Sequence, residues 1–247
     1  SGESSRPEAG GAIMSASVSD SGYFAVISEE TGSKGLVRVF DSDCRLLYKW
    51  YSGTGYPLRA QLSPDNSRLA VLCVDGTGSR VHVFRLTSED EQALIEYPGE
   101  LLCDMYFMNA STLCAIGSSG VRFLGLSGEK LGEYSFNGRY LAAYDFGSTS
   151  FAAICLSDYR AGAGGELVTL GADGTELGSC EISGDLISLS ATGKQLLAAT
   201  SDALTLYSQT LEEVSREDTL MTAKQALLRP KGDVLLLSLY SAERFSF

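Results

Sequence analysis

The stretch LRAQLSPDNSRLAVL at residues 58–72 decides the fold. Two runs suited to β-strands, 58–62 and 68–72, flank the turn-forming residues SPDNS. A third such run, VHVF, follows at residues 81–84, and a fourth, ALIEY, at residues 93–97. Short runs rich in β-branched and aromatic residues, separated by turn residues, are typical of antiparallel strands. This stretch therefore predicts four successive strands that pair in order.

The four-strand unit recurs along the chain with a period of about 40 residues. Equivalent positions in the third strand of each copy are Val39, Val83, Phe123, Thr169, Leu206 and Phe247. A four-strand unit repeated at this spacing is typical of a β-propeller, whose blades are four-stranded sheets. The absence of helical periodicity between the strands argues against an α/β fold. A β-sandwich is the alternative, but it does not require this period.

The predicted fold class is therefore all-β: a six-bladed β-propeller of four-stranded antiparallel blades. A single domain is expected over residues 12–247, after a flexible leader at residues 1–11. The last copy stops at its third strand, so its blade is completed either by the N-terminus or by a strand upstream of the chain. The expected blades are residues 12–53, 56–98, 101–137, 140–182, 184–218 and 221–247.

Net charge and composition limit the classes of partner that the chain is expected to bind. The formal net charge is −12, with no lysine- or arginine-rich block, so neither nucleic acid nor an anionic membrane surface is an expected partner. No apolar run has the length of about 18 residues that a membrane span needs. The chain starts at Ser1 rather than at a methionine, which leaves room for a signal or membrane anchor upstream. The six cysteines form no C-x-x-C pair and are expected to be free thiols.

The segment LSPDNSRLAV at residues 62–71, followed by VHVF at 81–84, resembles the WD40-like and YVTN-like propeller repeats of bacteria. This resemblance implies the propeller fold. The chain is also similar to bacterial propellers of unknown function that a single N-terminal helix holds outside the membrane. That similarity implies an extracytoplasmic location, with a cytoplasmic one as the alternative. No Trp-Asp dipeptide ends a third strand, in contrast to eukaryotic WD40 proteins.

Motifs that carry catalysis are missing from the sequence. His82 is the only histidine, and its place inside VHVF favours a structural role. A site with several histidine ligands is thereby excluded, and no P-loop, nucleophile elbow or calcium loop is found. We therefore predict a protein that is not an enzyme, with no catalytic residues, no cofactor and no metal.

Acidic residues on the expected first strands leave one catalytic alternative open. Asp104, Asp145 and Asp185 fall on strands that line the channel of a propeller, where glycoside hydrolases place paired carboxylates. A carboxylate-dependent glycoside hydrolase or lyase is therefore a second alternative. Arg59 and Asp104 occupy equivalent places in adjacent copies, so an ion pair between them is the simpler interpretation.

Binding residues are expected on the loops between blades and on the loops that join second and third strands. The longest loops of the latter kind are residues 29–35 and 158–166. Tyrosine and arginine are frequent in recognition surfaces because they combine large contact area with directed hydrogen bonds. The predicted binding residues are Tyr56, Arg59, Arg139, Tyr140, Tyr159 and Arg160.

The predicted function is a non-catalytic binding module for a protein or a glycan. The alternative for the site is a purely structural role, in which the tyrosines only cover the edges of the blades. A sensory or structural ectodomain of an anchored protein is the first alternative for the function.

Overall fold

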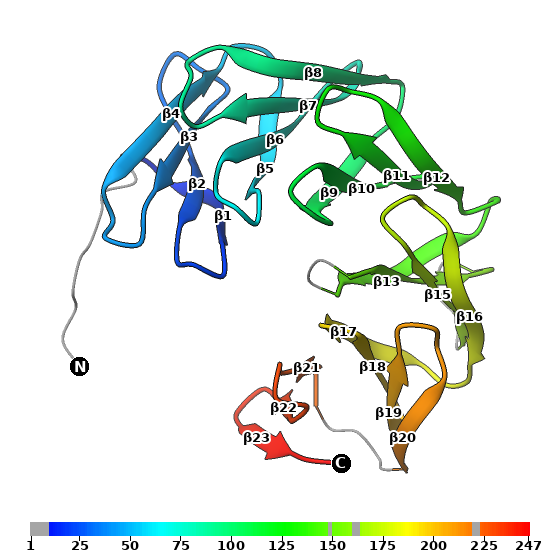
Figure 1. The fold of residues 1–247 in the computed structure, drawn as a ribbon. Helices are drawn as coiled ribbons and strands as arrows, with labels where there is room; N and C mark the ends of the chain where they lie inside the picture. Colours follow the sequence, from blue (N-terminus) through cyan, green and yellow to red (C-terminus); the bar gives the residue numbers. More distant parts are fainter. Residues whose placement is uncertain (1–9, 148–149, 160–163, 219–222) are drawn as a thin grey trace. The chain divides into compact units, whose positions relative to one another are not determined.

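The computed structural model describes residues 10–147, 150–159, 164–218 and 223–247. Every regular element in these ranges is a β-strand (Figure 1). Within them, no helix has the length and apolar character needed to cross a bilayer. Residues 1–9 of the predicted leader and the predicted binding residue Arg160 lie outside the described residues.

Residues 1–131 form one compact unit and residues 132–247 a second, with the boundary inside β12. The first unit carries two complete sheets and most of a third. The strands of the first sheet are β1 (Ile13–Val18), β2 (Phe24–Ser28), β3 (Gly35–Phe40) and β4 (Leu46–Ser52). Those of the second are β5 (Tyr56–Leu62), β6 (Arg68–Asp75), β7 (Gly78–Arg85) and β8 (Glu91–Pro98). Those of the third are β9 (Leu102–Phe107), β10 (Thr112–Gly117), β11 (Gly120–Gly125) and β12 (Lys130–Ser135).

The second unit carries the remaining three sheets. The fourth sheet consists of β13 (Tyr140–Phe146), β14 (Ala152–Ser157), β15 (Gly165–Leu170) and β16 (Glu176–Ile182). The fifth consists of β17 (Leu186–Thr192), β18 (Gln195–Thr200), β19 (Ala203–Ser208) and β20 (Glu213–Asp218). The sixth consists of β21 (Gln225–Leu228), β22 (Val234–Leu237) and β23 (Ala242–Phe245).

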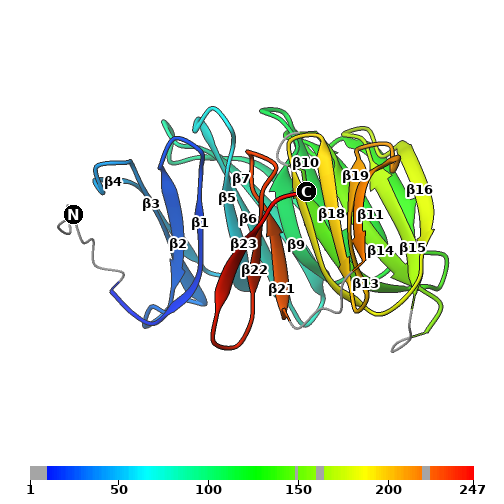
Figure 2. The same cartoon turned by 90° about the horizontal axis from the view of Figure 1, so that it is seen from below.

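Each sheet pairs its strands in chain order, so every sheet is an antiparallel meander. Figure 2 shows this order in the first sheet, where β1 to β4 lie side by side. The predicted four-strand unit is confirmed in five sheets, and the sixth sheet has three strands among the described residues. One alignment was wrong: Arg244, and not Phe247, lies opposite Leu235 at the position equivalent to Val83.

Within each unit, neighbouring sheets pack face to face. In the first unit, β5 contacts both β1 and β9, and in the second unit β17 contacts both β13 and β21. The apolar residues of β6 and β7 are buried on both faces, against the first sheet on one side and the third on the other. Residues of β18 and β19 are likewise buried against the fourth and sixth sheets. Within each unit, the first strands of consecutive sheets therefore lie next to one another, as they do in the blades of a propeller.

Short turns join the strands, and their side chains explain why they form. The carboxylate of Asp65 accepts the N–H of Ser67 at 3.1 Å, and that of Asp173 accepts the N–H of Thr175 at 3.0 Å. Asn66 and Gly174, the residues between them, have φ of 53° and 81°. Asn and Gly are the residues that adopt such left-handed conformations most readily. The turn predicted from SPDNS at residues 63–67 is confirmed.

Truncation of Phe84 tests the packing between the first and second sheets. Its ring is fully buried and lies 5.8 Å from the ring of Tyr48 and 5.2 Å from that of Trp50. Phe84→Ala removes these contacts and leaves a cavity, so it should lower the free energy of unfolding by about 3–5 kcal/mol. Chemical denaturation followed by tryptophan fluorescence measures this change.

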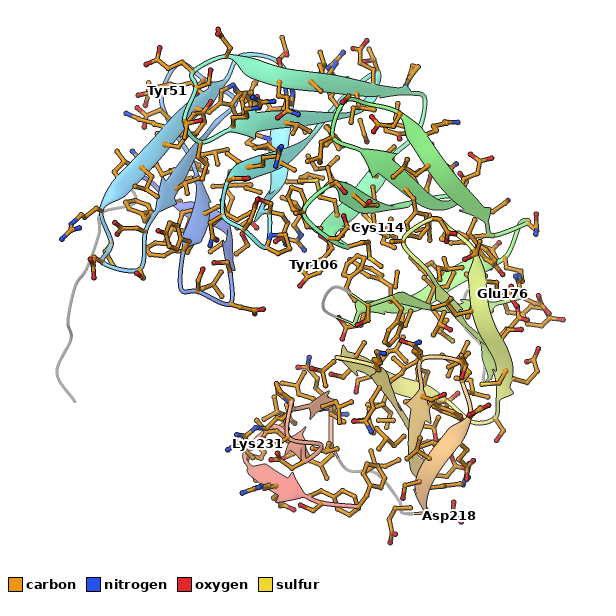
Figure 3. The ribbon with its side chains drawn as sticks, viewed as in Figure 1. Tyr51, Tyr106, Cys114, Glu176, Asp218 and Lys231 are labelled. Atoms are coloured by element: carbon orange, nitrogen blue, oxygen red, sulfur yellow. The ribbon has the colours of Figure 1, made fainter. Side chains whose placement is uncertain are left out.

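Tyr51→Ala is the matched control, because Tyr51 lies on the outer strand β4 and is half exposed (Figure 3). Its ring contacts the Lys49 ammonium at 4.7 Å, a surface interaction that contributes about 1 kcal/mol at most. Equal losses of stability in the two variants would contradict the packing described for Phe84.

Candidate functional site

A pocket of about 490 Å³ lies at one end of the fourth sheet. Three loops form it: the turn that precedes β13, the connection from β14 to β15, and the connection from β16 to β17. These are the two kinds of loop on which binding residues were expected. The lining residues used below are Arg139, Asp158, Tyr159, Glu166, Glu181 and Gly184.

Two glycines allow the loops to approach each other. The N–H of Gly164 donates to the carbonyl of Gly184 at 2.7 Å, which ties the β14–β15 connection to the β16–β17 connection. Both glycines have positive φ, 82° and 84°. A Cβ atom on Gly184 would lie 2.8 Å from a carboxylate oxygen of Asp202. Glycine adopts this left-handed backbone conformation without strain.

Arg139 is held by a turn and by an ion pair. Its N–H donates to the carbonyl of Phe136 at 3.0 Å, and Asn137 inside that turn has a φ of 52°. The guanidinium contacts the carboxylate of Glu166 on β15, and this hydrogen bond is the main reason that the pKa of Arg139 is raised. Both side chains are about three-quarters buried. Arg139 therefore neutralises Glu166.

One tyrosine lines the pocket, and a second lies at the start of the neighbouring strand β13. Tyr159 lines it and is 73% exposed, so most of its ring is available for contact. Tyr140 is the first residue of β13 and pairs in register with Ser157, which also lines the pocket. Tyr140 is 46% exposed. The structure thus brings two of the predicted binding residues, Arg139 and Tyr159, to one pocket, and Tyr140 follows Arg139 in the chain at the start of β13.

Sequence reasoning missed the acidic residues of this pocket. Glu166 and Glu181 lie directly opposite each other on β15 and β16, and Asp158 lies in the β14–β15 connection. Like charges placed directly across a sheet repel each other. Arg139 pairs with Glu166, whereas Asp158 and Glu181 have no hydrogen-bond or ion-pair partner among the residues that the structure describes. Two carboxylates therefore face this pocket without a described counter-charge.

The other two predicted residues, in the first unit, do not share a pocket. Tyr56 lines a second pocket of about 490 Å³ at the end of the first sheet, where the Lys34 ammonium lies 4.9 Å from its ring. Arg59 donates from Nε to the carboxylate of Asp104 at 2.9 Å and from Nη1 to Ser15 at 3.3 Å. The expected ion pair is present, and it links the first strands of the second and third sheets.

Other residues considered for catalysis have structural partners. The carboxylate of Asp145 accepts the N–H of Ala191 at 2.8 Å and so joins β13 to β17. His82 is buried, with Nδ1 at 2.6 Å from Glu91 and its ring 4.9 Å from that of Trp50. The structural role predicted for His82 agrees with this environment. No group of three His, Cys, Asp or Glu side chains in the described ranges is placed to hold a metal ion.

Solved structures with the same arrangement of strands are β-propellers. A β-propeller domain of Cps50 (Swd1) from Myceliophteria thermophila matches with a TM-score of 0.62 and 11% identity, over 95% of this chain and 82% of that chain. The C-terminal WD40 domain of Sif2 matches with a TM-score of 0.57 and 10% identity, over 95% and 81%. Hsv2 from Kluyvelomyces marxianus matches with a TM-score of 0.69 and 7% identity, over 95% and 72%.

These similarities, with the four-stranded sheets, identify the fold class as a WD40-like β-propeller. The six-bladed count and the single-domain arrangement stay predictions. No curated protein sequence matches the chain. The chain belongs to DUF5711, a family of unknown function, which matches residues 1–225.

Buried thiols offer a test of the sheet interiors. All six cysteines are free thiols, and Cys73, Cys114 and Cys155 are buried in β6, β10 and β14. Burial raises the pKa of Cys73 to about 12 and that of Cys155 to about 11. At pH 8 only about one Cys73 thiol in ten thousand is then a reactive thiolate.

Alkylation with iodoacetamide at pH 8, followed by mass spectrometry of peptides, should therefore leave these three cysteines unlabelled in the native protein. The exposed Cys103 should be labelled, and all six should be labelled in guanidinium chloride. Native labelling of Cys73 as fast as that of Cys103 would show that β6 is not buried.

Proposed function

We propose that the chain is a non-catalytic binding module that recognises a protein partner through the pocket of the fourth sheet. The observation that carries the proposal is the pocket itself, which is lined by Arg139 and Tyr159, with the exposed Tyr140 next to Arg139 at the start of β13. Its volume of about 490 Å³ is within the range of sites that take a peptide side chain or a small molecule. Loops on a rigid β-scaffold are common places for recognition.

Chemistry at the pocket favours recognition over turnover. Tyr159 and Tyr140 offer exposed aromatic area together with hydroxyl groups, a combination enriched in protein interfaces. Arg139, the only arginine among the described residues that line the pocket, already pairs with Glu166. The WD40 and β-propeller domains among the similar structures support this reading through their fold alone.

Selection of peptides from a random display library on the immobilised protein tests the proposal. Peptides that are enriched should bind the Tyr140→Ala/Tyr159→Ala double variant at least tenfold more weakly, because truncation of an aromatic anchor commonly costs 2 kcal/mol or more. Tyr51→Ala on β4 is the control and should bind the same peptides as tightly as the parent protein.

Thermal unfolding keeps the test independent of folding. Both tyrosines of the double variant are exposed, so its melting temperature should stay within a few degrees of that of the parent. Peptides that bind the double variant and the parent equally would refute this pocket as the site. A glycan array that yields tyrosine-dependent ligands, with no peptide enriched, would replace the protein partner with a glycan.

A further inference from the structure

The second sheet carries two carboxylates at the positions equivalent to Asp158 and Glu181 of the fourth sheet, and there they bind a guanidinium. Arg80 on β7 lies opposite Cys73 on β6 and Glu96 on β8, and Asp75 follows Cys73 by two residues. The Arg80 guanidinium donates to Glu96 at 2.9 Å and also contacts Asp75. These hydrogen bonds, that to Glu96 first, raise the pKa of Arg80. Two carboxylates therefore hold one guanidinium there.

The same register in the fourth sheet carries a different middle residue. Glu166 on β15 lies opposite Leu156 on β14 and Glu181 on β16, and Asp158 follows Leu156 by two residues. Asp158 and Glu181 thus occupy the places of Asp75 and Glu96. Glu166 occupies the place of Arg80, so the internal guanidinium is replaced by a carboxylate.

The pocket is larger in the sheet where a carboxylate replaces the guanidinium. The pocket lined by Arg80 and Glu96 measures about 60 Å³, whereas the equivalent pocket lined by Glu166 and Glu181 measures about 490 Å³. In the first sheet the equivalent cross-strand pair is Leu36 and Tyr51, which carries no charge. Asp158 and Glu181, the equivalents in the fourth sheet of Asp75 and Glu96, therefore line the larger pocket.

We infer that the pocket of the fourth sheet is a receptor for one arginine side chain of the partner. Asp158 and Glu181 bind its guanidinium, and the exposed ring of Tyr159 at the pocket contacts its planar face. Among the described residues Arg139 neutralises Glu166, which leaves Asp158 and Glu181 for a ligand with one positive charge. This inference rests on the proposed function and names the chemistry of its partner.

Physical chemistry favours an arginine for this place. A guanidinium donates several hydrogen bonds in one plane, as Arg80 does to Asp75 and Glu96, and it stacks on aromatic rings. Two carboxylates, Glu166 and Glu181, lie directly opposite each other, a local conflict that the pairing of Glu166 with Arg139 relieves. Such local conflicts are expected at functional sites.

N-acetyl-arginine amide is the probe, and N-acetyl-citrulline amide is its neutral isostere. Titration followed by amide NMR should shift Tyr159 and Glu181, with a dissociation constant on the order of millimolar for a ligand of this size. The citrulline probe and the Asp158→Asn/Glu181→Gln double variant should each bind at least tenfold more weakly, because both remove the charged hydrogen bonds. N-acetyl-lysine amide should bind more weakly than the arginine probe.

Glu96→Gln is the matched control, because Glu96 holds the same position on β8 but is paired with Arg80. This variant should bind the arginine probe as tightly as the parent does. Equal binding of the citrulline and arginine probes, or undiminished binding by the double variant, would overturn the arginine receptor. Selected peptides that need Tyr140 and Tyr159 but contain no arginine would overturn it as well, while the proposed binding module would stand.

Arg80→Ala provides a gain of binding in the second sheet. Removal of the guanidinium leaves Asp75 and Glu96 without their shared counter-charge and opens space between them. The arginine probe should then also shift the amides of Thr77 and Glu96, which it leaves unchanged in the parent. A folded Arg80→Ala protein in which the probe shifts neither amide would show that this register does not define a guanidinium site.

Discussion

Burial of the middle strands on both faces is the constraint on which every sheet depends. All six residues of β10 and all six of β14 are buried, although successive side chains point to opposite sides. Around β6 and β7 the first sheet covers one face and the third sheet covers the other. A charged group in the interior of these strands would lose its hydration without a partner. Accordingly, β10 and β14 carry no charged residue.

The end of each sheet is thus where the repeat is free to vary. One register position carries Leu36 in the first sheet, Arg80 in the second and Glu166 in the fourth. The strands around this position keep their pairing, because the buried part of each strand sets the register. A change of residue at the sheet end therefore changes the chemistry of a pocket without disturbing the core. The acidic pocket of the fourth sheet is such a variation on the ion pair of the second.

Much of the fold follows from the sequence, because periodicity reports directly on burial. The equivalent positions Val39, Val83 and Thr169 lie in equivalent places on β3, β7 and β15. The third-strand position of the last copy was predicted wrongly as Phe247, because the length of the hairpin, and not the spacing of aromatic residues, sets the register. The turn at residues 238–241 is short, with the N–H of Ser238 bonded to the carbonyl of Ser241, and this sets Arg244 opposite Leu235.

The site was predicted only in part, because residue type was weighed without register. Tyrosines and arginines on loops were recognised as candidates, but Arg139 is engaged by Glu166 and Arg59 by Asp104. Acidic residues are numerous in a chain of net charge −12, so that residue type alone does not distinguish a binding carboxylate from one on the solvent-exposed surface. The equivalence of the two sites is visible in the alignment of the repeats. Arg80 lies three residues before Val83, and Glu166 lies three residues before Thr169.

Local geometry, and not net charge, gives the acidic pocket its selectivity. At physiological ionic strength the field of distant surface charges is screened beyond about 8 Å. The overall charge of −12 therefore raises the encounter rate with cationic partners but does not select among them. Selection depends on groups in contact, and here these are Asp158, Glu181 and the ring of Tyr159. Arg139 matters because it neutralises Glu166 and so limits the cost of the remaining carboxylates.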